Sequence, residues 1–213
     1  MQIYFLGEDK FEGVENLILN EFKFFHFDIN FNDFDALIIS SKNALRALEF
    51  NQIKPDFNKP LFAVGEKSAK KAIKMGFKKV KFPKLAYGKN LVNEFKNELK
   101  NKHCLYLRAK QIASNLDFLL INEGVKLSQI IAYENIYKHS NLKLIRPCVF
   151  IFSSPLQVSN FLKTYKLEKD DKCVVIGQST KKALKDFENI FLSKNTNLNS
   201  CVKLAKKLAN FNK

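Results

Sequence analysis

Two stretches of the chain repeat one pattern, and this duplication limits the folds that the chain can adopt. The segment IISSKNALRAL, with Ser40 and Ser41, returns as IFSSPLQVSNF, with Ser153 and Ser154, and AVGEKSAKK returns as VIGQSTKKA. Each copy runs from an apolar strand through a small polar turn into an amphipathic helix, which is typical of an α/β unit. The sequence therefore predicts two α/β units of one architecture.

The spacing of the repeats supports this duplication. Ser153 follows Ser40 by 113 residues and Gly177 follows Gly65 by 112, so two separate motifs keep nearly one register. The length of 213 residues accommodates two units of about 100 residues each. Ligands bind beyond the carboxyl ends of the strands in open α/β sheets, where both repeated turns belong. We therefore expect the functional site at these turns.

Hydrophobic patterning predicts the secondary structure of both repeats. A continuous apolar run at 36–39 indicates a strand buried on both faces of a parallel sheet, and 61–64 repeats this pattern. Further strands are predicted at 80–82, 105–107, 149–152, 173–176 and 190–192. Apolar residues at helical spacing predict helices after Asn43, from about Ser68 to Gly76, at 91–99, at 112–123, after Pro155, after Thr180 and at 200–210.

The N-terminal part and the middle of the chain show further patterns. Residues 2–6 are predicted to form a first strand, and apolar residues at helical spacing predict a helix at 11–22. Apolar and polar residues alternate strictly from 25 to 31, which predicts a half-exposed strand. A short strand near Val125 is expected before the extended, tyrosine-rich segment 130–139.

The formal net charge of +15 has two explanations. AT-rich codons produce a chain rich in Lys, Asn, Phe and Ile without selection for charge, whereas a basic cleft attracts an anionic ligand. The lysines are scattered, and neither a zinc finger nor an RNP-type string is present, so we expect no nucleic-acid partner. The first apolar run, at 3–6, is too short for a signal peptide or a spanning helix, so we expect a cytoplasmic protein without membrane association.

The cysteines and histidines are isolated from one another. No CxxC pair occurs, and the three histidines lack a spaced set of Cys or carboxylate ligands, so we expect no metal site. The cysteines are expected to be reduced thiols in the core; they are Cys104, Cys148, Cys173 and Cys201.

Six short motifs follow one another along nearly the whole chain. They are Ser40-Ser41-x-Asn43-Ala44, Ala63-Val64-Gly65-x-x-Ser68-Ala69, Leu107-Arg108, Ala132-Tyr133-Glu134, Phe152-Ser153-Ser154-Pro155 and Ile176-Gly177-x-Ser179-Thr180. No single string is specific, but the ordered set at this spacing is. The set resembles the uroporphyrinogen-III synthase family.

The resemblance implies an α/β fold of two HemD-like, flavodoxin-like domains, with parallel sheets flanked by helices, joined by a two-stranded antiparallel ladder. It implies one domain of residues 1–27 and 141–213, a second of 31–131, and crossing segments at 28–30 and 132–140. The residues alone indicate two consecutive halves instead. Many family members carry Thr-Arg-Pro after the first strand, where this chain has Leu6-Gly7-Glu8-Asp9.

The resemblance also implies a reaction. Members of the family cyclise the linear tetrapyrrole hydroxymethylbilane to uroporphyrinogen III, with loss of water and inversion of ring D through a spiro intermediate, and without a cofactor. Spontaneous closure gives the unrearranged isomer, so holding the shape of the substrate is the main task of the enzyme. We expect a monomer that makes transient contact with the preceding pathway enzyme. The alternative is a non-catalytic two-domain module that binds an anionic ligand.

A substrate with eight carboxylates needs hydrogen-bond donors, which strand-to-helix turns supply as free N–H groups. The expected substrate-binding residues are Ser40, Ser41, Lys42, Asn43, Gly65, Ser68, Arg108, Ser153, Ser154, Gly177, Ser179 and Thr180. The resemblance places Tyr133 near the cleft on a crossing segment, where its phenol would be a weak general acid for the departing hydroxyl.

Each of these assignments has a structural alternative. Ser68 and Thr180 can simply cap helices, and small residues such as the four repeated serines suit any tight turn. Lys42 can be a solvated charge, and Arg108 can form a structural salt bridge instead of a bidentate carboxylate clamp. Tyr133 can be a packed strand residue whose hydroxyl is merely satisfied.

Overall fold

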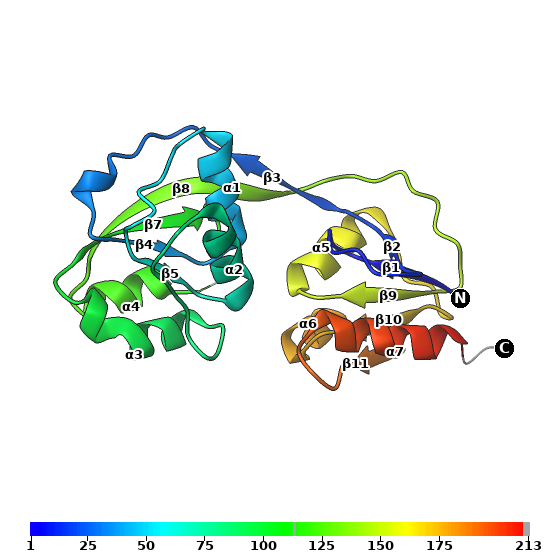
Figure 1. Ribbon diagram of the computed structural model, residues 1–213. Coiled ribbons are helices and arrows are strands. Elements are labelled where there is room, and N and C mark those ends of the chain that lie inside the picture. The colour runs from blue at the N-terminus through cyan, green and yellow to red at the C-terminus, as the bar shows by residue number, and fades with distance from the viewer. Residues whose placement is uncertain (113, 211–213) are drawn as a thin grey trace. The chain divides into compact units, whose positions relative to one another are not determined.

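The computed structural model describes residues 1–112 and 114–210, and the chain divides into two compact units (Figure 1). Unit 1 contains Met1–Glu21 and Ile136–Lys213, and unit 2 contains Phe22–Asn135. The chain leaves unit 1 within strand β3 (Asn20–Phe24) and returns within strand β8 (Lys126–Tyr137). It therefore passes between the units inside two strands.

Strands β3 and β8 are neighbours in one sheet and run antiparallel. The N–H of Phe25 donates to the carbonyl of Ala132 (3.1 Å), and the N–H of Lys138 donates to the carbonyl of Leu19 (3.0 Å). The partner number falls as the residue number rises, which defines the antiparallel direction. The continuity of these hydrogen bonds explains why both crossings lie within regular strands.

Unit 2 contains a six-stranded sheet in the order β3-β8-β7-β4-β5-β6, in which the five strands from β8 to β6 are parallel. The further strands are β4 (Ala36–Ile39), β5 (Leu61–Ala63), β6 (Val80–Lys81) and β7 (His103–Ala109). The helices are α1 (Lys42–Phe50), α2 (Glu66–Met75), α3 (Gly88–Leu99) and α4 (Leu116–Asn122), and a 3-10 turn spans Phe31–Asp33.

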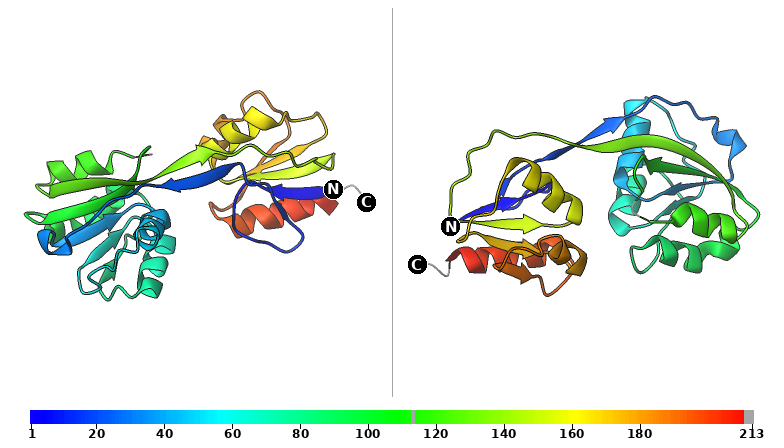
Figure 2. Two further views of the ribbon diagram at one scale, coloured as in Figure 1. Left: turned by 90° about the horizontal axis from the view of Figure 1, so that it is seen from above. Right: turned by 180° about the vertical axis from the view of Figure 1, so that it is seen from behind.

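Helices cover both faces of the unit 2 sheet, which explains the continuous apolar runs of its strands (Figures 1 and 2). Leu37 and Ile39 of β4 pack in the core on the side of α1 and α2, whereas Ala36 and Ile38 pack on the side of α3 and α4. All four side chains are fully buried. The predicted strand at 36–39 is therefore confirmed, with successive side chains entering two separate cores.

Unit 1 contains a five-stranded parallel sheet in the order β2-β1-β9-β10-β11, the flavodoxin-like order 2-1-3-4-5. Its strands are β1 (Gln2–Phe5), β2 (Glu15–Asn16), β9 (Cys148–Phe152), β10 (Lys172–Val175) and β11 (Ile190–Leu192). Helices α5 (Pro155–Thr164) and α6 (Gln178–Lys182) cover one face, and α7 (Leu198–Asn210) covers the other (Figure 2). The predicted α/β class with helix-flanked parallel sheets is confirmed.

Two predictions for the N-terminal part are wrong. The expected helix at 11–22 is replaced by a turn, by β2 and by an extended stretch in which Leu17 and Leu19 point into the core. The expected strand at 25–31 is irregular and ends in the 3-10 turn. The side chain of Asn51 binds the carbonyl of Phe25 (2.9 Å) and accepts from the N–H of Phe27 (3.4 Å), so these groups are satisfied without a partner strand.

Other boundaries shift by a few residues. The helix expected at 112–123 is α4, which begins at Leu116, and Ala113 lies outside the described residues. The helix expected after Thr180 begins before it, at Gln178. Gly76 ends α2 as predicted, because its φ of 115° is a conformation that favours glycine. The short strand near Val125 and the crossing segment merge into β8.

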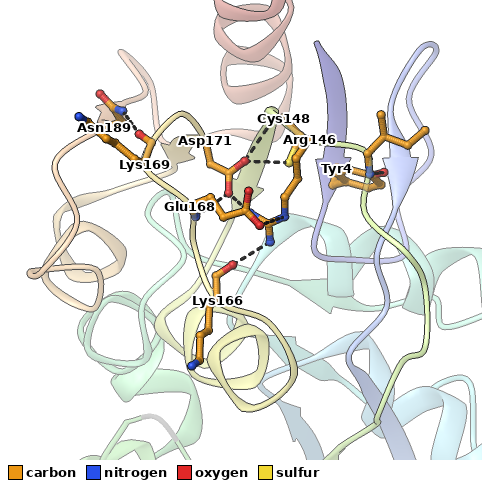
Figure 3. A network of polar contacts seen from close by, with 9 residues as sticks. Tyr4, Arg146, Cys148, Lys166, Glu168, Lys169, Asp171 and Asn189 are labelled. Carbon is orange, nitrogen blue, oxygen red and sulfur yellow. Dashed lines mark hydrogen bonds and ion pairs between the residues drawn. The ribbon is translucent and has the colours of Figure 1, made fainter.

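The amino-terminal edge of the unit 1 sheet carries a polar network around Asp171, which is fully buried (Figure 3). Its carboxylate pairs with Arg146 and accepts from the N–H groups of Cys148 (3.2 Å) and Glu168 (2.9 Å). Arg146 also donates to the carbonyl of Lys166 (2.7 Å). This network ties the segments that enter β9 and β10, at the edge opposite to the repeated turns.

The four cysteines are free thiols and all are buried, as predicted. Burial raises the pKa of the Cys104 thiol from 9.0 to about 11, and it also raises the pKa values of the other three thiols. Among the described residues, no helix is long and apolar enough to cross a membrane.

Candidate functional site

The topology of unit 2 creates a crevice between β4 and β7. The chain leaves β4 towards β5 on one side and leaves β7 towards β8 on the other, so the strand order reverses between them. Ligands of open α/β sheets bind at such a switch point, beyond the carboxyl ends of the strands. A pocket of about 390 Å³ lies there. Its lining residues are Ser40, Ser41, Val64, Ala86, Tyr87, Gly88, Tyr106, Ala109, Gln111, Ile112, Ser114 and Tyr133.

A bulge in the sheet places Tyr133 at this pocket. Arg108 of β7 pairs with Ile131 of β8, but the next residue, Ala109, pairs with Tyr133, so Ala132 is an extra residue in β8. The N–H of Lys110 then donates to the carbonyl of Tyr133 (2.8 Å). Bulges redirect side chains and are frequent beside active sites. Without the extra residue, Ala132 would lie where Tyr133 now stands.

The ring of Tyr133 is held by aromatic packing. It lies edge-on to Phe22 (centroids 6.1 Å apart) and tilted against Phe24 (6.5 Å). The guanidinium of Arg46 lies over the rings of Phe22 (5.7 Å) and Phe24 (5.5 Å). Tyr133 is 4% exposed, and the side that remains accessible faces the pocket. The packing fixes the direction of its phenol.

Ser41 connects the cap of α1 to Tyr133. The Ser41 hydroxyl oxygen accepts from the N–H of Asn43 (3.3 Å), and the same hydroxyl is hydrogen-bonded to the phenol of Tyr133. Either hydroxyl can donate in this bond, because the serine oxygen can accept a second hydrogen bond. The Ser41–Tyr133 pair therefore uses one O–H within the bond and keeps the other for an acceptor in the pocket.

Burial raises the pKa of Tyr133 above its usual value of 10.0, and the hydrogen bond with Ser41 offsets part of this effect. The neighbouring Tyr106, which sequence reasoning missed, also has a raised pKa because it is buried, and Ser40 is its hydrogen-bond partner. At neutral pH both phenols are protonated. They are suited to donating hydrogen bonds and poorly suited to giving a proton away completely.

The second turn of the repeat differs from the prediction. Gly65 and Gly177 are the N-cap residues of α2 and α6, without a capping side chain. Ser68 and Thr180 are the third residues of these helices and are buried, so the alternative that they are N-cap residues is wrong. The reason is that the backbone already turns helical directly after the glycine. Ser179 is exposed.

The first turn of unit 1 is closed by a side chain that has no counterpart in unit 2. The main-chain N–H of Ser153 (2.6 Å) and its hydroxyl (3.1 Å) both donate to Gln157 Oε1. Ser154 is the N-cap of α5 and accepts from the N–H of Gln157 (3.3 Å). A side chain on Gly7 would come within 2.6 Å of the Phe5 ring and 3.3 Å of Gln157 Nε2, so the ring and this amide together fill the place beside β1.

Three of the residues predicted for the unit 2 site, Arg108, Asn43 and Lys42, are not among those that line its pocket. Arg108 donates from Nε to Gln129 Oε1 (2.7 Å) and from Nη1 to the carbonyl of Ala109 (2.9 Å), so it ties β7 to β8. Asn43 is buried and its Oδ1 accepts from Arg46 (3.2 Å). Lys42 is exposed at the start of α1.

Within residues 1–112 and 114–210, no three His, Cys, Asp or Glu side chains are grouped so that they could hold a metal ion. The pocket instead presents neutral donors. They include the pairs Ser40–Tyr106 and Ser41–Tyr133, each with one O–H left over from its internal bond, and the side chains of Gln111 and Ser114, with the exposed ring of Tyr87 beside them. Such a set can bind oxygen atoms of an anionic or hydroxylated ligand.

Comparison with known proteins gives one family. The family model described as uroporphyrinogen-III synthase HemD matches residues 21–203. The structure is similar to the crystal structure of uroporphyrinogen-III synthetase from Helicobacter pylori, with 30% identity, a TM-score of 0.83, and coverage of 97% of this chain and 99% of that chain. A mutant uroporphyrinogen III synthase from Thermus thermophilus, with 12% identity, a TM-score of 0.59 and coverage of 97% and 98%, shares the fold. A comparison with curated protein sequences finds no significant match.

Proposed function

Since the chain belongs to the uroporphyrinogen-III synthase family, we propose that the switch-point pocket of unit 2 holds one end of hydroxymethylbilane during its cyclisation. The chain cyclises this linear tetrapyrrole in tetrapyrrole biosynthesis, as its family and its relative of 30% identity indicate. The family match over residues 21–203 is the observation that carries this function.

The neutral donors of the pocket support the binding of a terminal pyrrole ring. Ser40 and Ser41 follow β4 directly, and Tyr133 is aimed at the same space by the bulge in β8. The ring of Tyr87, which is 67% exposed at the rim, offers a face for stacking. We assign the hydroxymethyl-bearing ring to this pocket, because hydroxyl donors match a hydroxyl group and its departing oxygen.

In this assignment Tyr133 acts as a neutral hydrogen-bond donor. Its raised pKa disfavours the phenolate, so complete proton transfer from it is costly. The electron-rich pyrrole supplies the electron pair that expels the oxygen, and a donor at that oxygen stabilises the charge that develops on it. The larger contribution is geometric, since the protein has to bring the substituted carbon of ring D to the reacting carbon.

The turns and the charge of the chain suit the eight carboxylates. We include the exposed Lys42, the amides that follow Gly65 and the turn from Gly177 through Ser179 to Thr180 among the carboxylate-binding groups. Asn43, Ser68 and Arg108 support these turns from buried or paired positions. In the first turn of unit 1, Ser153 is engaged with Gln157, which leaves Ser154 as the candidate donor. The net charge of +15 attracts such a substrate.

The test supplies freshly made hydroxymethylbilane to the purified chain, with a metal chelator present and no cofactor added. We expect mainly the type III isomer when the porphyrins are separated. Type I alone would mean that the chain does not cyclise its substrate with inversion, and that a binding module describes it better.

We further propose that the chain works as a cytoplasmic monomer that receives hydroxymethylbilane by transient contact with the enzyme that makes it. The substrate closes spontaneously to the wrong isomer, so rapid transfer favours the correct product. Sedimentation of the purified chain should give the mass of one chain, and a stable dimer would contradict this proposal.

A further inference from the structure

A second tyrosine shares the floor of the switch-point pocket with Tyr133. Tyr106 lies on β7, is 1% exposed, and lines the same pocket. Its ring packs in the core on the side of α3 and α4, whereas the ring of Tyr133 packs in the core on the side of α1 and α2. The two phenols therefore reach one pocket from opposite faces of the sheet.

The two phenols are supported in the same way. The hydroxyl of Ser40 is hydrogen-bonded to Tyr106, and the hydroxyl of the adjacent Ser41 is hydrogen-bonded to Tyr133. Each bond uses one O–H of its serine–tyrosine pair, so each pair keeps one O–H for a ligand in the pocket. One turn, Ser40–Ser41, holds both pairs.

The internal repeat shows that the fold does not need the Tyr106 hydroxyl. Tyr106 lies opposite Ile38 in unit 2, as Phe5 lies opposite Ile151 in unit 1. Ile38 and Ile151 each precede the repeated serine pair by two residues, so Phe5 is the counterpart of Tyr106. Phe5 is 2% exposed, so an unsubstituted ring fills this place equally well. The Tyr106 hydroxyl lines the pocket beside Ser40 and is not needed to fill the core, which points to a role for it in the pocket.

We propose that Tyr106 is a second hydroxyl donor to the substrate and that, with Tyr133, it binds the oxygen of the terminal hydroxymethyl group. This inference rests on the proposed function of the pocket. When the C–O bond breaks, its electron pair stays with the oxygen, and the pyrrole nitrogen supplies the pair that stabilises the carbon. The oxygen leaves as water with one added proton, and the closing ring later releases one proton. Two donors stabilise the charge on the departing oxygen.

The test uses two ligands that differ only in this hydroxyl. They are hydroxymethylbilane as substrate and the bilane with a terminal methyl group as competitive inhibitor. For Tyr106→Phe we expect kcat/KM to fall about threefold to tenfold, the effect of one neutral hydrogen bond. The inhibition constant of the methyl bilane should equal that of the parent. Tyr106→Phe should fold, because Phe5 fills the equivalent place in unit 1, and thermal unfolding verifies this.

Tyr4→Phe is the matched control, because it removes the phenol of another buried tyrosine. The Tyr4 hydroxyl accepts from the N–H of Ile145 (3.0 Å) in the network of Figure 3. We expect an unchanged kcat/KM for this variant. An unchanged kcat/KM for Tyr106→Phe, or an equal loss of affinity for both ligands, would overturn the inference. Formation of the type III isomer by the parent, measured alongside, keeps the proposed function separate from either outcome.

Discussion

At the scale of single residues, the pocket of unit 2 relies on hydroxyl groups. Burial keeps both phenols protonated at neutral pH, and each is hydrogen-bonded to a serine of one turn. Arg108 is the one arginine predicted at the site, and its guanidinium donates hydrogen bonds to the side chain of Gln129 and to main-chain carbonyls. The site therefore favours binding and orientation over strong acid–base chemistry.

Tyr133→Phe should lower the activity without abolishing it. The variant loses one donor but keeps the packing against Phe22 and Phe24, so we expect a folded protein whose kcat/KM is about tenfold lower. Steady-state assays with hydroxymethylbilane measure this, and thermal unfolding verifies the fold. Complete loss of activity in a folded variant would show that the phenol transfers a proton that no other group supplies.

At the scale of elements, apolar runs predicted the central strands well, because helices cover both faces of β4 and β9, whereas the edge strand β11 is only partly buried. The prediction of a helix at 11–22 was wrong because the spacing of four apolar residues fits a helix by coincidence. In the structure Leu17 and Leu19 alternate into a core, and the chain has to extend towards β3. Tyr106 was not predicted as a site residue because a tyrosine within an apolar strand is usually a core residue. The alignment of Tyr106 with Phe5 in the other repeat was the feature of the sequence that could have indicated it.

The network of Figure 3 gives a prediction about how elements are joined. Asp171→Ala leaves Arg146 without its buried partner and removes the acceptor of two main-chain N–H groups. We expect the free energy of unfolding to fall by about 3–5 kcal/mol. Glu168→Ala is the control, because that side chain is 64% exposed and its ion pair should contribute at most about 1 kcal/mol. Equal losses in denaturant titrations would contradict this account of the network.

At the scale of the whole molecule, the two units share one architecture, but the order of the corresponding strands along the chain differs between them. Strands β4, β5 and β6 correspond to β9, β10 and β11, and β7 and β8 correspond to β1 and β2, so both sheets have one spatial order. This permutation is why the residues alone indicated consecutive halves, whereas the resemblance implied a discontinuous first domain. The internal repeat predicted the positions of both sets of turns. No pattern in the sequence indicated the bulge in β8 or the hydrogen bonds of the Gln157 amide.

The buried thiols and phenols of both units predict a loss of stability at alkaline pH. The folded state holds the proton of Cys104 more tightly, since its pKa rises from 9.0 to about 11. Stability from this group is complete below pH 9 and is lost as the pH rises towards 11, by at most about 3 kcal/mol. Denaturant titrations between pH 8 and about 11 measure this. Cys104→Ala should show a shallower decline, and an identical decline would contradict the assignment to Cys104.

The central claim is that substrate binds at the carboxyl ends of the strands, with the Ser–Tyr pairs of unit 2 in contact. Backbone amide NMR of the chain with uroporphyrinogen III, under anaerobic conditions, tests it most directly. We expect the largest shifts at Ser40, Ser41 and Tyr133 and at the turn after Gly65, with the amides of Cys148 and Asp171 unchanged at the opposite edge of the unit 1 sheet. Shifts at Cys148 and Asp171, with the Ser40–Ser41 turn unaffected, would contradict the claim.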